Sequence, residues 1–305
     1  MRDLCKRVIF KNKSFLLEGK IYFPKNFNDS YLYKTVVIVG SGSNVKEQAT
    51  AIYAKNLSGN DLITFIFDPS FMGNSSGEPR YLEDPLITIE DIKCAADYLM
   101  TLSYVDEHNL CLLGIGSGGG YAVNAAMTDY RFSSLATVVG LNIGSSYRKI
   151  LGRENVRKAI MELSTQRTLQ ARGGKKLYAE SLDGSMGETK EKSFSHTDLI
   201  EAIRFHRECE MQHNDPFLLI SLSHILGFDS FHMLSELLIQ PLLVVVADDE
   251  TTESYKHGMQ LFYMASSEIK NFSVIEGAKH YEMYSNIPTI LKVIAKLSTF
   301  YNKEY

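Results

Sequence analysis

Short apolar runs without polar alternation recur along the chain, separated by longer amphipathic stretches. Strands buried on both faces lose the inward and outward alternation, so these runs predict parallel strands. They lie at 35–39, 62–67, 109–113, 135–141, 241–247 and 271–275. The stretches between them repeat apolar residues every three to four positions, which predicts helices. These stretches lie at 46–58, 84–102, 119–128, 251–265 and 287–302. Strand and helix in alternation predict an α/β fold with a doubly wound, mostly parallel sheet.

Two regions depart from this pattern. Residues 7–23 alternate loosely and stop at Pro24, which favours an antiparallel hairpin at a sheet edge. The region from about 145 to 240 has helical periodicity but no convincing strand. We therefore expect a core formed by residues 1–144 and 241–305, with 145–240 inserted as a helical cap over the carboxyl edge of the sheet.

Composition narrows the class of protein. The chain has 305 residues, of which 45% are hydrophobic, and this is enough to bury a large core. A net charge of −4 without a lysine or arginine run argues against nucleic acid as a partner. The four cysteines form no Cys-x-x-Cys pair, and no signal-peptide or membrane-length apolar run is present. We expect a cytoplasmic protein with a small-molecule substrate and no membrane contact. A homodimer is one assembly that the sequence allows.

One predicted strand enters a glycine-dense turn that continues as a helix. A sharp turn of this kind presents a nucleophile in some hydrolases, and it needs small residues two before and two after its centre. Gly114 and Gly118 meet that need around Gly116, which has no side chain. Centring the turn on Ser117 would place β-branched Ile115 where it crowds the backbone. Because the centre has no side chain, the adjacent Ser117 is the candidate nucleophile, one position after the centre. Its backbone N–H is a candidate oxyanion donor.

Three further strand ends carry candidate chemistry. Gly42 and Ser43 follow the first buried strand, where a loop can lend a backbone N–H to an oxyanion hole, although a flexible turn is the plainer interpretation. Asp249 follows a later strand as the candidate acid, with Asp248 as the alternative, although such carboxylates also cap helices. His280 follows the last strand as the candidate base. Nucleophile, acid and histidine then occur in the order of a hydrolase triad.

Two rival kinds of site are less well supported. Gly114, Gly116 and Gly119 also satisfy the dinucleotide pattern G-x-G-x-x-G. The next strand, however, ends at 139–142 without the acidic residue that would hold a ribose hydroxyl, and the pattern does not lie in the first βαβ unit. The central histidines are dispersed without metal-ligand spacing, so we expect no metal and no cofactor. These histidines are His206, His213, His224 and His232.

Taken together, several segments resemble the α/β-hydrolases, in the dienelactone-hydrolase-like branch with a Cys or Ser nucleophile and a helical cap. The segments that carry the resemblance are 45–48, Phe67-Asp68, 73–80, Glu90-Asp91-Ile92, 118–122, 166–167, 171–174, 228–232 and 276–280. The resemblance implies an α/β-hydrolase fold that cleaves an ester, thioester or related acyl bond. Carried over by position, the nucleophile falls on Gly116, the acid on Asp249 and the base on His280.

Glycine at the nucleophile position leaves two functions open, because glycine cannot form a covalent intermediate. In the first, Ser117 swings into the site and His280 activates it, so that the chain is a hydrolase of small apolar acyl substrates. In the second, the site has lost acyl transfer, and the chain is a ligand-binding or scaffold protein.

Overall fold

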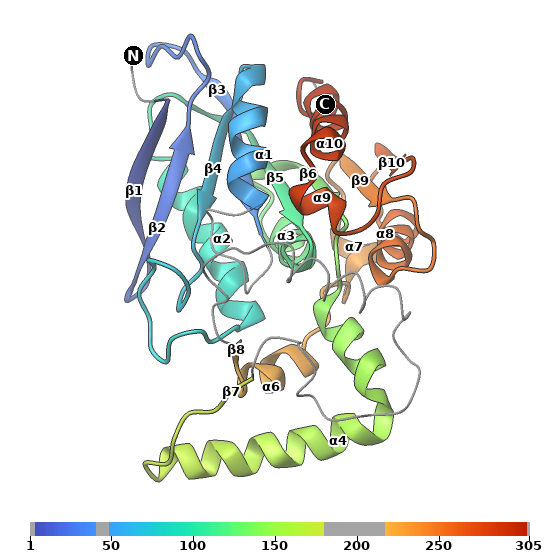
Figure 1. Ribbon diagram of the computed structural model, residues 1–305. Helices are drawn as coiled ribbons and strands as arrows, with labels where there is room; N and C mark the ends of the chain where they lie inside the picture. Colours follow the sequence, from blue (N-terminus) through green and yellow to red (C-terminus); the bar gives the residue numbers. More distant parts are fainter. Residues whose placement is uncertain (1–3, 41–48, 180–216, 304–305) are drawn as a thin grey trace.

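The computed structural model describes residues 4–40, 49–179 and 217–303 (Figure 1). Gly42, Ser43, His206 and His213 fall outside these ranges. Within them, no helix combines the length and the apolar character that crossing a membrane would require.

One sheet of eight strands organises the molecule. Its spatial order is β1 (Cys5–Asn12), β2 (Phe15–Tyr22), β4 (Ile63–Phe67), β3 (Tyr33–Val39), β5 (Val105–Ile115), β6 (Phe132–Val138), β9 (Leu242–Ala247) and β10 (Lys270–Ile275). β2 runs antiparallel to both β1 and β4, and every other neighbouring pair is parallel. The predicted edge hairpin and the predicted doubly wound sheet are both confirmed.

Helices cover both faces of the sheet. The core on one face is completed by α2 (Pro85–Leu99), α3 (Ser117–Thr128) and α8 (Glu253–Met264). The core on the other face is completed by α1 (Ala49–Leu57), α9 (Glu282–Ser285) and α10 (Ile287–Tyr301), and a 3₁₀ turn at Ser58–Asn60 follows α1. In β5, Leu112 belongs to the first core and Leu113 to the second. Burial on both faces is the physical reason why the strand sequences show no alternation.

The strand β6 ends earlier than its apolar run suggests. The run continues to Leu141, but pairing stops at Val138 because Val139 adopts a φ of 43°, which a strand cannot accommodate. The chain then turns toward the end of β5, where Leu141 N donates to Gly116 O at 2.9 Å. A tertiary contact with the glycine turn thus fixes where this strand ends.

The segment between β6 and β9 contains helices and one minor strand pair. These are α4 (Ile143–Ala171), β7 (Tyr178–Ala179), β8 (Phe217–Leu218), α6 (Ser221–Leu226) and α7 (Leu234–Leu237). Figure 1 shows α4 bending and running away from the sheet, and the bend lies at Gly152, whose φ is 71°. Phe228, Phe231 and Leu234 instead pack into the core beside α3. The division into a core and a cap at 145–240 stays a prediction.

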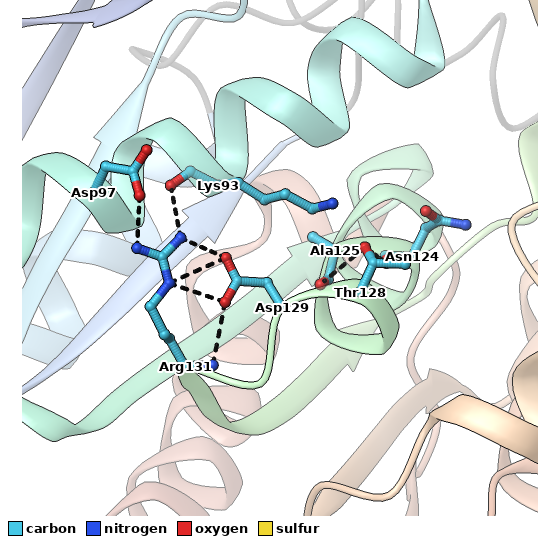
Figure 2. A network of polar contacts seen from close by, with 7 residues as sticks. All are labelled: Lys93, Asp97, Asn124, Ala125, Thr128, Asp129 and Arg131. Atoms are coloured by element: carbon cyan, nitrogen blue, oxygen red, sulfur yellow. Dashed lines mark hydrogen bonds and ion pairs between the residues drawn. The ribbon is translucent and has the colours of Figure 1, made fainter.

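An exposed arginine ties α2 to the turn that precedes β6 (Figure 2). Arg131 Nη1 donates to Asp97 Oδ1 at 2.6 Å, and its Nε and Nη2 donate to the Asp129 carboxylate at 2.9 and 2.5 Å. Nη2 also reaches the backbone oxygen of Lys93 at 3.4 Å. The planar guanidinium makes these contacts at once, which fixes the start of β6 against the helix that covers it.

Candidate active site

The glycine turn after β5 has the backbone of a sharp strand-to-helix elbow. Gly116 lies at its apex with φ 61° and ψ −130°, a conformation that side chains rarely adopt, and α3 begins at the next residue. Its N–H donates to Val138 O at 3.0 Å, and its carbonyl accepts from Gly119 N at 2.9 Å. The apex that sequence spacing assigns to Gly116 is therefore the apex of the folded turn.

The glycines around the apex are required by close packing. A Cβ on Gly114 would lie 2.5 Å from Gly119 Cα, and a Cβ on Gly119 would lie 2.6 Å from Gly140 Cα. A Cβ on Gly118 would overlap the backbone carbonyls of residues 39 and 40 at the end of β3. The elbow is thus packed tightly between the ends of β3 and β6. This packing explains why these positions are glycines without invoking a dinucleotide site.

Ser117 is the first residue of α3, and the residue is buried, with 5% of its surface exposed. The positive end of a helix dipole favours negative charge at this position. The loop expected to supply the other oxyanion donor begins directly after Gly40, which lies against Gly118. The candidate residues Gly42 and Ser43 themselves lie outside the described residues, so their oxyanion role stays a prediction.

His280 lies in the turn between β10 and α9, with 7% of its surface exposed. Its Nδ1 is 2.8 Å from Ser254 Oγ, and its Nε2 is 3.4 Å from the Tyr284 hydroxyl. The Tyr281 ring packs edge-on against the imidazole at 4.7 Å between centroids. Burial lowers the pKa of His280 from its ordinary 6.5 to about 4, so the ring is neutral at neutral pH.

The expected acids are engaged elsewhere. Asp249 Oδ1 accepts from the backbone N–H and the hydroxyl of Thr251, and Asp248 Oδ2 accepts from Gly277 N at 2.9 Å. In the part of the chain that the structure describes, no hydrogen bond or ion pair joins His280 to either carboxylate. The acid role of Asp249 therefore stays a prediction. Ser254 makes the Nδ1 contact, and the only sequence signal for it is its place in the first turn after the acids.

The residue before the elbow and the residues that flank His280 belong to one hydrophobic core, on the face of the sheet opposite to α3. Ile115, which precedes the apex, belongs to the same core cluster as Ala278 and Tyr284, which flank His280. From α1, the Tyr53 hydroxyl donates to the Met283 carbonyl at 2.8 Å and so anchors α9 to this cluster. The end of β5 and the turn after β10 thus both contribute to this core.

The described part of the chain shows no cluster of metal-binding side chains. Among the described residues, no group of three or more His, Cys, Asp or Glu side chains could hold a metal ion. His224 pairs instead with Asp84, at 2.9 Å between Nδ1 and Oδ2.

Comparisons with known proteins agree with this geometry. Residues 82–143, which include the elbow, match the model of the prolyl oligopeptidase family. Uncharacterized protein YcjY of Escherichia coli is 34% identical, and the alignment covers 96% of this chain and 95% of that protein. A thiohydrolase of Eupenicillium brefeldianum is 35% identical over 31% of each chain.

The fold is also that of a solved hydrolase. The α/β hydrolase GrgF from Penicillium superposes with a TM-score of 0.78 at 17% identity, covering 97% of this chain and 98% of that one. The eight-stranded, mostly parallel sheet with helices on both faces confirms the expected fold class. The chain therefore belongs to the family of YcjY and has the α/β-hydrolase fold.

Proposed function

We propose that this chain hydrolyses a small apolar ester, thioester or related acyl substrate. The observation that carries the proposal is the buried, neutral His280, held at Nδ1 in the turn after β10 and packed in one cluster with the residue before the elbow. A neutral imidazole held through one nitrogen can accept a proton on the other. The partial likeness to a thiohydrolase supports an acyl bond as the target.

In the proposed reaction, Ser117 is the nucleophile and His280 the base. Ser117 Oγ attacks the acyl carbon while its proton moves to His280 Nε2, and His280 then returns that proton to the leaving alcohol or thiol. Water, deprotonated in turn by His280, attacks the acyl carbon, and the bond from that carbon to Ser117 Oγ breaks. His280 returns the proton to Ser117 Oγ, and the acid is released. The backbone N–H of Ser117, with Gly42 and Ser43, would stabilise the oxyanion. Asp249 is the expected orienting acid, and a role for it would require its carboxylate to leave Thr251.

A second function is favoured by one observation. The apex position, from which an elbow presents its nucleophile, is held by Gly116. A site that keeps the histidine and the elbow but has no nucleophile would bind an acyl ligand without turning it over. The two functions differ in whether Ser117 takes part in a covalent step.

The deciding experiment compares wild type with Ser117→Ala, His280→Ala and Gly116→Cys on short-chain nitrophenyl esters and acyl thioesters. A serine-directed phosphonate followed by mass spectrometry locates any covalent adduct. We expect turnover by wild type, an adduct on Ser117, and loss of activity in the first two variants. Wild type without turnover or adduct, together with measurable turnover in Gly116→Cys, would contradict the hydrolase function and support the second function instead.

A further inference from the structure

The nitrogen of His280 that a hydrolase triad gives to a carboxylate is held here by a chain of hydroxyl groups. Nδ1 contacts Ser254 Oγ at 2.8 Å, and Ser254 Oγ contacts Thr252 Oγ1 at 3.3 Å. Thr252 Oγ1 donates to the backbone carbonyl of Asp249 at 2.8 Å. Each of the two hydroxyl residues is only 1% exposed, so solvent does not compete for these contacts.

The carbonyl at the end sets the direction of every proton in the chain. A carbonyl oxygen has no proton, so Thr252 must donate its own to Asp249 O. Thr252 Oγ1 then has only lone pairs left, of which one accepts the N–H of Tyr255 at 3.3 Å. Its contact with Ser254 therefore requires the Ser254 hydroxyl to donate. With its proton committed, Ser254 Oγ can meet His280 Nδ1 only as an acceptor.

We infer that Ser254 and Thr252 are positioning residues, which fix His280 as the tautomer with hydrogen on Nδ1 and a lone pair on Nε2. In the opposite tautomer Ser254 would donate to Nδ1, and the Ser254 and Thr252 oxygens would lie 3.3 Å apart with no proton between them, so one hydrogen bond of the buried chain would be lost. The Tyr284 hydroxyl, 3.4 Å from Nε2, can pair with either tautomer, so the assignment rests on the contact between Ser254 and Thr252.

The inference rests on the proposed function in one respect, since the base of that reaction must present Nε2 unprotonated. It also predicts a chemical difference between this histidine and the base of a hydrolase triad. An uncharged chain orients the ring but stabilises the imidazolium less than a carboxylate would, so this base is weaker than that of a triad. Orientation is supplied by hydroxyls, while the carboxylates of the same turn bind backbone and Thr251.

Nuclear magnetic resonance of protein with ¹⁵N-labelled histidine tests the tautomer without any substrate. The chain has eight histidines, and the His280 signals are those that disappear in His280→Gln. At neutral pH, we expect a pyrrole-type Nδ1 and a pyridine-type Nε2 in wild type. Ser254→Ala should convert His280 to a mixture of tautomers, whereas Thr252→Ser, which keeps the hydroxyl, should leave the signals unchanged.

A matched control is Ser298→Ala, because Ser298 Oγ is also buried and has no hydrogen-bond partner among the described residues. This variant should leave His280 as in wild type. Thr252→Val tests the second link, and we expect it to shift His280 in the same direction as Ser254→Ala. Hydrogen on Nε2 in wild type, or an unchanged tautomer in folded Ser254→Ala, would overturn the inference. Absence of esterase turnover with the expected spectra would contradict only the proposed function.

Discussion

Gly116 combines a missing side chain with an unusual backbone. At φ 61° a glycine is unstrained, whereas other residues held in such regions carry about 1–3 kcal/mol of strain. An elbow with a nucleophile at this point would store that strain, and this chain does not. The loss of the side chain therefore relieves the turn while the close contacts of Gly114 and Gly118 are retained.

The strain predicts a stability change. Gly116→Ala should lower the free energy of unfolding by roughly 1–3 kcal/mol, because alanine at positive φ is strained in the folded state. Urea unfolding of wild type and variant measures the difference. Gly59→Ala is the control, since that glycine has a negative φ and open space around its Cβ position. An equal effect in both variants would refute strain at the apex.

Two buried histidines predict how stability depends on pH. Burial lowers the pKa of both His280 and His257 from 6.5 to about 4, and His257 Nδ1 accepts from Asn142 N. The unfolded chain binds these protons first as pH falls, so unfolding becomes easier between pH 6.5 and 4. The loss should approach about 3 kcal/mol for each histidine. Urea unfolding across this range checks it, and His257→Gln should flatten the curve.

At the scale of elements, α3 is held by contacts that only glycine allows. Gly118 packs against the end of β3, and its missing Cβ leaves room for two backbone carbonyls that cannot move aside. Gly118→Ala should therefore destabilise the protein by roughly 1–3 kcal/mol through overpacking. Thermal unfolding compares it with Gly59→Ala, which we expect to be nearly neutral. A Gly118→Ala variant as stable as wild type would show that the elbow can shift.

The arginine fork of Figure 2 gives a second prediction for elements. Arg131 is 39% exposed on its side chain, so its contacts with Asp97 and Asp129 are screened by water. Arg131→Ala should lower the free energy of unfolding by about 1 kcal/mol or less, and the loss should shrink with added salt. A double-mutant cycle with Asp97→Asn measures the coupling. A loss that does not change with salt would indicate packing rather than charge.

At the scale of the molecule, the loop before α2 contacts the segment between β6 and β9 through hydrogen bonds and an ion pair. Leu218 N donates to Tyr81 O at 3.2 Å, Glu83 N donates to Ser221 Oγ at 2.9 Å, and Asp84 pairs with His224. Glu83 also accepts from the Tyr121 hydroxyl on α3, and burial raises the pKa of its carboxyl. One loop thus connects α2, α3 and α6.

This connection makes α6 sensitive to one hydroxyl. Ser221→Ala leaves the buried N–H of Glu83 without its acceptor, which should cost about 1–3 kcal/mol. Relative to wild type, amide hydrogen exchange in this variant should become faster in α6 but not in α10. Ser223→Ala is the matched control, because Ser223 Oγ donates to the nearby Ile220 carbonyl rather than to the loop before α2. Equal exchange rates of α6 in the two variants would show that the contact with the loop does not stabilise this helix.

The sequence by itself determined the elements and their order. Apolar runs without alternation located the parallel strands, helical periodicity located the helices, and the spacing of Gly114 and Gly118 located the apex at Gly116. It also placed His280 in the turn after the last strand. These features are local, because backbone geometry and burial on two faces leave a trace in consecutive residues.

Only the tertiary structure decided which groups meet. Val139 ends β6 because the chain must reach the elbow, and Phe228 joins the main core beside α3. Ser254 Oγ, and not the carboxylate of Asp249, lies against Nδ1 of His280, 26 residues along the chain. Local patterns carry no information on such pairs. A hydroxyl and a carboxylate in one turn are equally plausible partners until packing fixes which of them points at the ring.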